Sequence, residues 1–487
     1  MLPGDIPALH PGSKTAIEGE DRNWTYGRLD ELCDRFAALF AARGCEPGDR
    51  VSLLCSNEAL LAGAYFGAFR ARLVANPINN RLLPEEVAYI LEHAGSRCVV
   101  VSGEYVDLAE RTLPLLKAAP VMLRAADVAG APAGPAGRVP VAEDGALLIY
   151  TSGTTGKPKG VVLTQGNVMA GISIVSRAFE MKPGDRTFCV MPLFHTNGLM
   201  FSTLPFLLTG ATVVMRKRFS ASNFWSQIRE SRATTTSVSP TILAMLLEHE
   251  AKAPPASEIR LEYIKVASAP TPVELAQRFE ARFGRGLLLE TYGLTETTAI
   301  NVMNPLRGPR KHGSIGRALA PQEVRIVDDA GNEVPQGASG EIEVRGPTVM
   351  KEYFRDPENT RRAMHGEWLR TGDVGRIDED GFVFIVGRSK EMILRGGENI
   401  SPLEIEEVAV RHPAVREAAA VGVPDRIWGE AVGLCVVARH PVTEHDVVEF
   451  CRAHLSAFKV PQRVVFVDEL PRNAVGKVTR NALRGVF

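Results

Sequence analysis

A stretch dense in glycine, hydroxyl and lysine residues, YTSGTTGKPKG at residues 150–160, is the part of the chain best suited to chemistry. It lies between two apolar runs, ALLIY (146–150) and GVVL (160–163), which predicts a loop between two buried strands. Glycines let successive backbone N–H groups converge on an anion, and hydroxyl and ammonium groups add further donors. The stretch therefore predicts a polyphosphate site, although its spacing is neither G-x-x-x-x-G-K-[ST] nor G-x-G-x-x-G. A flexible surface turn is the alternative interpretation.

Four further stretches with chemically active residues follow this loop along the chain. They are MPLFHTNGL (191–199), ETYGLTETT (290–298), LRTGDVGRIDEDGFVFIVGRSKEMILRGGENISPLEIE (369–406) and PRNAVGKVTR (471–480). In this order, the five stretches resemble the motifs of the adenylate-forming superfamily, which contains acyl-CoA synthetases, adenylation domains and firefly luciferases. The resemblance covers nearly the whole chain, and it is greatest to an AMP-forming acid:CoA ligase.

The chemistry that this resemblance implies joins a carboxylic acid to ATP and then to a thiol. The acid attacks the α-phosphate of Mg·ATP to give an acyl-adenylate and pyrophosphate, and the thiol of coenzyme A then displaces AMP. A carboxylic acid is already ionised at pH 7, so the first step needs no general base. Because two anions must meet, cations and N–H donors are the expected catalysts. The implied cofactors are Mg²⁺, ATP and coenzyme A.

Residues at the nucleotide end are assigned by their match to the family motifs. Glu296 matches the carboxylate that binds Mg²⁺, an ion that prefers oxygen ligands, and Thr295 matches the hydroxyl directed at the α-phosphate. Asp373 matches the carboxylate that accepts the ribose hydroxyls, and Arg388 matches a further ribose contact. Tyr292 offers a flat ring for adenine. The other residues assigned to ATP are Thr151, Ser152, Gly153, Thr154, Thr155, Gly156, Lys157, Ser268, Ala269, Pro270 and Gly293.

Each of these residues has a plainer interpretation outside the ordered set. A tyrosine before glycine usually serves packing, and an aspartate in TGD is often a turn residue. Lys477, in NAVGK, would by itself be a solvated hairpin tip. The resemblance instead places Lys477 at the reaction centre, where it bridges the substrate carboxylate and the α-phosphate.

The resemblance also implies that a small domain turns between the two half-reactions. Lys390 matches the hinge of this rotation, which would withdraw Lys477 and bring in the RGGENI loop (395–400). The residues of this loop expected to line the thiol tunnel are Gly396, Gly397 and Glu398.

The acid is less well defined by the sequence than the nucleotide. His195 matches an aromatic gate at a position where amino-acid adenylating relatives carry aspartate, which disfavours an α-amino acid. Relatives that take dicarboxylic acids such as malonate have an arginine in the segment matching 239–249, and this chain has none there. The missing arginine disfavours a malonate-like acid and leaves oxalate-like and aromatic acids open. The predicted acyl pocket, which suits a compact acid with some polarity, consists of His195, Asn197, Ser239, Thr241, Ser268 and Thr297. The predicted catalytic residues are Lys477, His195, Thr295 and Glu296.

The elements that must position these residues alternate between helical and strand patterns, which predicts layered α/β sheets, largely parallel. Thr25 can cap a helix that ends at Gly44, and RVSLLC (50–55) and RCVVVS (97–102) are typical of buried strands. From about residue 320, EVRIVDD, GEIEVRG and GFVFIVG predict a mostly β subdomain. Ser401 and Glu404 predict a capping box that opens a helix of a small α+β unit.

Two domains are predicted from this change of pattern. Residues 1–389 form a large N-terminal domain that binds ATP and the acyl group. Residues 390–487 form a small mobile C-terminal domain that carries the catalytic lysine and the thiol-tunnel loop. The span between RCVVVS and the phosphate loop is short for the family, which trims part of the large domain.

Composition excludes several other classes of protein. The 56 Lys and Arg residues balance 57 Asp and Glu residues, so no global field would attract nucleic acid. The seven cysteines are scattered without a C-x-x-C pair, which argues against a disulfide scaffold or zinc site and favours reduced thiols in the cytoplasm. The N-terminus does not resemble a signal peptide. The uncharged segment 187–215 contains prolines and glycines, so we expect strands and a short helix there rather than an integral membrane segment.

Three readings of the activity remain open at this point. The first is a free-standing acid:CoA ligase, and the second is an adenylating enzyme that loads a carrier-protein phosphopantetheine arm. No basic cluster for the 3′-phosphate of CoA stands out, so the sequence does not separate these two. The third is a nucleotide-binding scaffold without activity, which Glu296, Asp373 and Lys477 argue against. A luciferin-shaped pocket is not evident.

Overall fold

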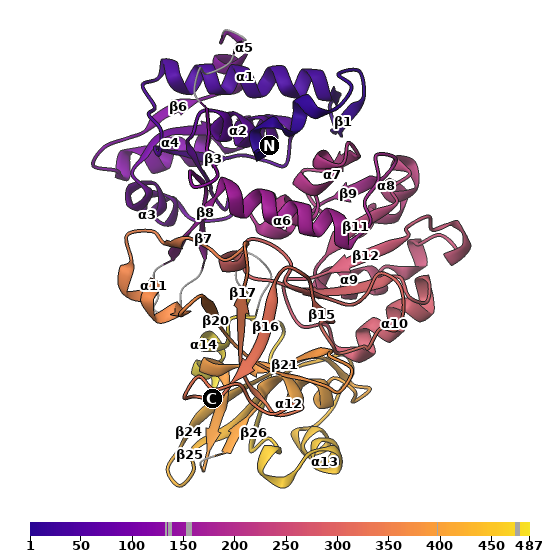
Figure 1. Cartoon of the computed structure of the whole chain (residues 1–487). Helices are drawn as coiled ribbons and strands as arrows, with labels where there is room; N and C mark the ends of the chain where they lie inside the picture. The colour runs from indigo at the N-terminus through magenta and orange to yellow at the C-terminus, as the bar shows by residue number, and fades with distance from the viewer. Residues whose placement is uncertain (132–133, 135–138, 152–157, 397, 473–477) are drawn as a thin grey trace.

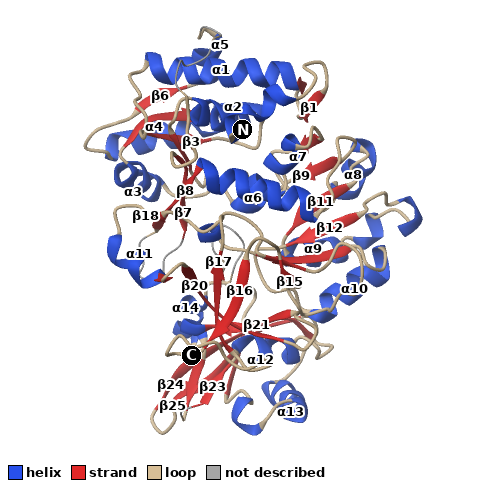
Figure 2. Cartoon of the chain, viewed as in Figure 1, coloured by secondary structure: helices blue, strands red, loops and turns tan. Residues whose placement is uncertain are grey.

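The computed structural model of the chain describes residues 1–131, 134, 139–151, 158–396, 398–472 and 478–487 (Figure 1). Within these residues the strands form four sheets, and the C-terminal unit, yellow in Figure 1, lies at the opposite end of the molecule from the N-terminal helices. Helices lie against the two larger sheets (Figure 2). The predicted fold, a large α/β domain with a β-rich subdomain and a small α+β domain, is confirmed.

The first sheet carries the phosphate-loop stretch near one edge. Its strands β7, β4, β3, β5 and β6 are parallel, and β8 runs antiparallel to β7, so the loop between β7 and β8 is a hairpin connection. In spatial order, the strands are β18 (Glu352–Tyr353), β8 (Lys159–Thr164), β7 (Gly145–Thr151), β4 (Val74–Pro77), β3 (Arg50–Leu54), β5 (Ser96–Val101) and β6 (Val121–Leu123).

The second sheet has a parallel centre and antiparallel edges. Strands β13, β12, β11, β9, β10 and β1 are parallel neighbours, as the alternation of strands and helices predicts. In spatial order, the strands are β15 (Arg317–Ala318), β14 (Val302–Met303), β13 (Leu288–Tyr292), β12 (Tyr263–Val266), β11 (Thr235–Val238), β9 (Arg186–Cys189), β10 (Thr212–Met215), β1 (Thr15–Glu18) and β2 (Asn23–Thr25).

The remaining two sheets belong to the β-rich subdomain and the small unit. The subdomain sheet is antiparallel and consists of β16 (Glu323–Val327), β17 (Gly340–Arg345), β20 (Trp368–Ile377), β19 (Met364–His365) and β21 (Val383–Arg388). The small unit contains β23 (Glu398–Ile400), β22 (Ile393–Arg395), β25 (Gly429–Ala438), β24 (Val415–Asp425) and β26 (Arg463–Phe466).

The long helices begin and end where their capping residues predict. Helix α1 (Tyr26–Ala42) starts at Thr25, whose hydroxyl accepts a hydrogen bond from the Arg28 N–H, and its buried face includes Leu29 and Phe36. Helix α6 (Gln165–Ala178) contacts β7, β8 and α7, so it links the two large sheets. The other helices of the large domain are α2 (Ala59–Arg70), α3 (Pro84–Ala94), α4 (Val106–Thr112), α5 (Ala125–Ala129), α7 (Leu204–Leu208), α8 (Phe224–Ser231), α9 (Pro240–Glu248), α10 (Val273–Phe283) and α11 (Pro357–Ala363).

The small unit contains α12 (Pro402–Ala409), α13 (Glu444–His454) and α14 (Arg480–Leu483). The predicted capping box at α12 is only half formed. The Ser401 hydroxyl accepts from the Glu404 N–H at 3.3 Å, but the Glu404 carboxylate pairs with Lys459 at 2.6 Å instead of returning to the cap. The ion pair between Glu404 and Lys459 therefore replaces the local hydrogen bond that would complete the capping box.

The uncharged segment 187–215 folds as predicted into β9, a π-helical turn η4 (Asn197–Phe201), α7 and β10. In the part of the chain that the structure describes, no helix is long and apolar enough to cross a membrane.

Candidate active site

The topology brings several predicted residues to one edge of the second sheet. His195 and Asn197 follow β9, Ser239 follows β11, Ser268 follows β12, and Tyr292 ends β13. These four strands are parallel neighbours, so their carboxyl ends lie at the same edge. In open α/β sheets this edge is where ligands bind. The fold therefore gathers the acyl and adenine assignments in one place.

The end of this edge that is predicted to bind the acid, the acyl end, is a chain of neutral polar side chains. Asn197, the first residue of η4, is 3% exposed, and its Nδ2 donates to the Ser268 Oγ at 3.1 Å. Its Oδ1 accepts from the hydroxyl of Ser237 on β11 at 2.6 Å. Ser237 was not among the residues assigned from the sequence, because every residue of β11 is buried and its strand pattern does not distinguish Ser237 from its neighbours.

The other end of the π-helical turn rests on a buried lysine. Lys265 on β12 is fully buried, and its Nζ donates to the Phe201 backbone oxygen at 2.8 Å. The ammonium also lies 4.5 Å from the centre of the Phe206 ring, a favourable cation–π arrangement. Burial lowers the pKa of Lys265 to about 7. Polar contacts thus hold η4 at both ends.

The end of the site that is predicted to bind the nucleotide, the nucleotide end, is charged. Asp373 on β20 and Arg388 on β21 are directly opposite in the ladder, and the Arg388 Nε lies 2.9 Å from Asp373 Oδ1. The Tyr292 hydroxyl donates to Asp373 Oδ2 at 2.6 Å. Burial, reinforced by the Asp373 charge, raises the pKa of Tyr292, and Asp373 raises the pKa of Arg388. Three residues that the sequence assigned to adenine and ribose are therefore in contact.

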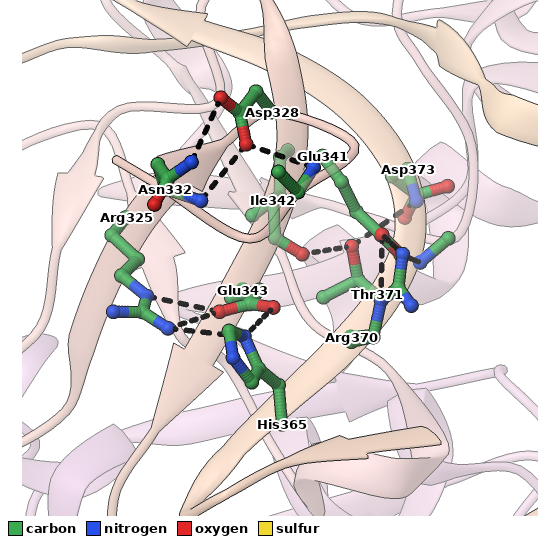
Figure 3. A network of polar contacts seen from close by, with 12 residues as sticks. Arg325, Asp328, Asn332, Glu341, Ile342, Glu343, His365, Arg370, Thr371 and Asp373 are labelled. Atoms are coloured by element: carbon green, nitrogen blue, oxygen red, sulfur yellow. Dashed lines mark hydrogen bonds and ion pairs between the residues drawn. The ribbon is translucent and has the colours of Figure 1, made fainter. Parts of the chain in front are cut away.

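A local irregularity of the subdomain sheet aims Asp373 (Figure 3). The ladder between β17 and β20 shifts register between Glu341 and Glu343, and Gly372 opposite this shift has a left-handed φ of 73°. The Glu341 carboxylate accepts from the Gly372 N–H at 3.1 Å, and the Thr371 hydroxyl donates to the Ile342 oxygen at 2.7 Å and accepts from the Asp373 N–H at 3.1 Å. The TGD sequence thus forms a turn that also orients Asp373, the predicted ribose contact.

Glu296 lies in the short turn η7 (Thr295–Thr297) and is hydrogen-bonded to β18, the neighbour of the strand that follows the phosphate loop. Its Oε1 accepts from the Tyr353 hydroxyl at 2.9 Å, and β18, which carries Tyr353, pairs with β8. Lys159, at the start of β8, has its Nζ 5.1 Å from the Tyr353 ring centre. Burial, with the nearby Glu296 charge, raises the pKa of Tyr353, so this hydroxyl stays a donor.

Glu296 fits a magnesium ion that is held mainly by substrate phosphates. Across the described residues, no group of three or more His, Cys, Asp or Glu side chains could hold a metal by itself. Mg²⁺ commonly takes one or two protein carboxylates and completes its shell with phosphate oxygens and water. The single half-buried carboxylate of Glu296 suits this mode.

Some predicted residues lie outside the described residues: Ser152, Gly153, Thr154, Thr155, Gly156, Lys157, Gly397 and Lys477. The structure does describe their flanks. Thr151 and Lys159 pair across β7 and β8 at the base of the phosphate loop, and Arg472 bridges to Val478 on either side of 473–477. Both loops therefore leave the fold at defined points.

Other predicted residues are described without being drawn into these contacts. Thr241 lies in the first turn of α9, Lys390 in the exposed turn η8 (Ser389–Glu391), and Glu398 is exposed on β23. Thr297 is fully buried, and its hydroxyl donates to the Asn301 side chain, an interior contact. The acyl role of Thr297 and the roles of the other three stay predictions.

Arg480 links the lysine loop to the predicted hinge. Its guanidinium lies 2.9 Å from Glu391 in η8, pairs with Glu406 on α12, and donates to the Ala420 oxygen at 2.9 Å. Arg480 stands three residues after Lys477, so the base of the lysine loop is fixed against η8. No pattern along the chain predicts this pairing, because its partners are far apart in sequence.

Comparison with known proteins identifies the family. A family model described as AMP-binding enzyme matches residues 6–354, and one described as AMP-binding enzyme C-terminal domain matches residues 404–477. The chain belongs to the AMP-binding enzyme family. This AMP-binding enzyme is 41% identical to sulfoacetate–CoA ligase of Cupriavidus necator over 472 residues, 94% of this chain and 91% of that one. It is 36% identical to oxalate–CoA ligase of Arabidopsis thaliana over 483 residues, 96% of this chain and 94% of that one.

Solved structures agree with this assignment. ATP-bound MatB from Rhodopseudomonas palustris has a TM-score of 0.92 and 31% identity, covering 100% of this chain and 99% of that chain. A benzoate CoA ligase from Burkholderia xenovorans LB400 has a TM-score of 0.91 and 29% identity, covering 99% and 100%. The predicted superfamily and enzyme class are confirmed: the AMP-binding enzyme is an acid:CoA ligase of the AMP-forming kind.

Proposed function

We propose that this AMP-binding enzyme activates a compact, polar carboxylic acid as an acyl-adenylate and then transfers the acyl group to the thiol of CoA. The observation that carries the proposal is that the residues predicted to bind the nucleotide and those predicted to bind the acid meet at one edge of the second sheet. A charged cluster suited to ribose, Asp373 with Arg388 and Tyr292, adjoins the strand ends that carry the neutral, hydrogen-bonded pair Asn197 and Ser268. The small polar acids named for the relatives, sulfoacetate and oxalate, support an acid of this size.

In the first half-reaction, a carboxylate oxygen of the acid attacks the α-phosphorus of ATP, and the bond to the β-phosphate oxygen breaks to release pyrophosphate. Lys477 stabilises the added negative charge on the carboxylate and α-phosphate, and Thr295 donates to an α-phosphate oxygen. Residues 151–157 hold the β- and γ-phosphates. Bound through Glu296, Mg²⁺ would reduce the charge of the phosphate oxygens.

In the second half-reaction, the CoA sulfur attacks the acyl carbon, the thiol proton is lost, and AMP leaves with the oxygen that came from the acid. The small domain, residues 390–487, turns about Lys390 between the steps. The turn withdraws Lys477 and brings residues 395–400, with Gly396, Gly397 and Glu398, to the thiol path. His195 then gates the path between the acid and the thiol.

The test is pyrophosphate release with Mg·ATP across a panel of short carboxylic acids, with and without CoA, against a control without acid. We expect release that depends on a particular acid and rises several-fold on adding CoA, with AMP and an acyl-CoA as products. Release that depends on an acid and is indifferent to CoA would transfer the proposal to a carrier-protein acceptor. Formation of ADP and phosphate instead of AMP and pyrophosphate would contradict it.

A further inference from the structure

The neutral chain at the acyl end runs from the interior to the open edge of the site. Ser237 and Asn197 are 1% and 3% exposed, whereas Ser268, the last member, is exposed. The Ser237 hydroxyl gives its proton to Asn197 Oδ1, and the Asn197 amide gives a proton to Ser268 Oγ. Each link is fixed by a strand end or by the π-helical turn, so the terminal hydroxyl is held in place.

The direction of this chain leaves one donor at its open end. A serine hydroxyl has one proton to donate and two lone pairs that accept. In the contacts between described residues, Ser268 Oγ accepts a hydrogen bond from Asn197, and the Ser268 hydroxyl donates to no acceptor. The chain therefore presents an O–H donor to the site.

The backbone of Ser268 supports a role for the hydroxyl. Its φ is 80°, in the left-handed region where a non-glycine residue is strained. Glycine would adopt this conformation without strain. Strain of this kind collects at ligand sites, and here the hydrogen bond from Asn197 contacts the strained residue.

We propose that Ser268 determines specificity by donating to a second acceptor oxygen on the acid, borne by the carbon next to the carboxyl group or by a substituent on that carbon. The substrate class is a short carboxylic acid with a hydroxyl, carboxylate or sulfonate oxygen at that position. The inference rests on the proposed function, because Ser268 must face the bound acid. Lys265 supports this neutral chain by donating a hydrogen bond to the Phe201 backbone oxygen at the other end of η4.

Three matched pairs of acids test the proposal. Each pair keeps the shape and replaces the acceptor by carbon: glycolate and propionate, oxalate and isobutyrate, sulfoacetate and 3,3-dimethylbutyrate. A site built around a donor discriminates strongly against an analogue that leaves the donor unpaired. We expect at least one acceptor-bearing acid to exceed its apolar partner more than about tenfold in kcat/KM. The pair that shows the preference identifies whether the acceptor is a hydroxyl, carboxylate or sulfonate.

Variants of Ser268 assign that preference to the hydroxyl. Ser268→Ala keeps the backbone strain and removes the donor, and Ser268→Gly removes both. In each variant kcat/KM for the preferred acid should fall about 10–100-fold, the effect of losing one hydrogen bond to a charged or buried acceptor. For the apolar partner it should change less than about threefold, a split that a merely structural role would not produce. Ser226→Ala is the matched control, because Ser226 is an exposed serine on α8 whose hydroxyl donates to the backbone oxygen of Asn223 at the start of that helix.

A binding measurement separates this proposal from the ligase function. Saturation-transfer NMR with wild type and both variants, in the presence of AMP, reports each acid without turnover. Selective binding that Ser268→Ala and Ser268→Gly abolish, without pyrophosphate release, would keep the specificity proposal and reject the ligase proposal. Equal or stronger binding and turnover of all the apolar partners, or a preference that survives in both variants, would overturn the specificity proposal. Failure of all six acids to bind would also overturn it.

Discussion

At the nucleotide end of the site, Asp373 and Arg388 form an ion pair across two strands, whereas at the acyl end Ser237, Asn197 and Ser268 form a chain without formal charge. Both are rigid, but they suit different ligands. In the proposed function the charged end takes ATP, which is the same for every acid, and oriented charges suit such a partner. The neutral end must discriminate among acids that share a carboxylate, so discrimination depends on where single donors lie.

This comparison assigns catalysis and choice of acid to different residues. Removing a charge at the nucleotide end or from the lysine loop should lower activity with every acid. Removing a donor at the acyl end should change the ranking of acids. Substitutions at the two ends should therefore have different effects on activity.

Lys477→Ala should lower acid-dependent ATP–pyrophosphate exchange by about 10³-fold, because one positioned donor to a developing anion is worth this much. Thiolysis of a supplied acyl-adenylate should fall far less, since no charge then builds on the α-phosphate. The two half-reactions are assayed separately. Lys252→Ala, an exposed lysine distant from these motifs, is the control. Equal losses in both half-reactions would remove Lys477 from its assigned role.

Asp373→Asn should raise the KM for ATP about 10–100-fold. The substitution removes the charged carboxylate acceptor, and the new amide presents an N–H donor to Arg388 or Tyr292. The ranking of acids should not change. Steady-state kinetics over an ATP series measures both. Asp328→Asn, which alters an exposed aspartate of the same subdomain, should leave the KM unchanged (Figure 3). A changed ranking of acids in Asp373→Asn would contradict the claim that the nucleotide end does not select the acid.

Glu296→Gln should raise the Mg²⁺ concentration for half-maximal activity by about tenfold, since the amide is a weaker ligand for a hard cation. A magnesium titration at fixed total ATP measures the shift. Glu352→Gln, at an exposed position on the neighbouring β18, is the control. An unchanged magnesium dependence in Glu296→Gln would mean that the ion is held without this carboxylate.

Lys265→Met tests the support of the acyl end through stability. The folded pKa of Lys265, about 7, lies below its ordinary value of 10.5, so the unfolded chain binds more protons between these two pH values. The lysine should therefore make the free energy of unfolding rise with pH above 7, approaching about 1.4 kcal/mol per pH unit. The variant should lack this slope. Thermal melts of both proteins from pH 6 to 9 measure it, with Lys252→Met as control, and parallel pH profiles would contradict the assignment.

The sequence predicted the parts of the fold that local patterns determine. Thr25 marks a helix start because its hydroxyl accepts a hydrogen bond from a backbone N–H group within one turn. The Ser401 box was only half right, because Glu404 finds Lys459 far along the chain. Patterns along the chain carry no record of such partners.

The same limit applies to the site. The motifs indicated Asp373, Arg388 and Tyr292 separately, but not the register that sets Asp373 opposite Arg388 or the bulge at Gly372. Ser237, Tyr353 and Arg480 escaped notice because each acts through a residue that is distant in sequence. Their side chains are ordinary ones for a strand or a helix start, and only the folded neighbours give them a role.

The central claim is that the acid attacks the α-phosphorus of ATP, and an oxygen label tests it most directly. The acid that the panel selects is prepared with ¹⁸O in its carboxylate, converted to its CoA thioester by the enzyme, and the nucleotide product is analysed by mass spectrometry. The account predicts AMP that carries one labelled oxygen, since the bridging oxygen of the adenylate leaves with the nucleotide. Unlabelled AMP, or label recovered in inorganic phosphate, would contradict it.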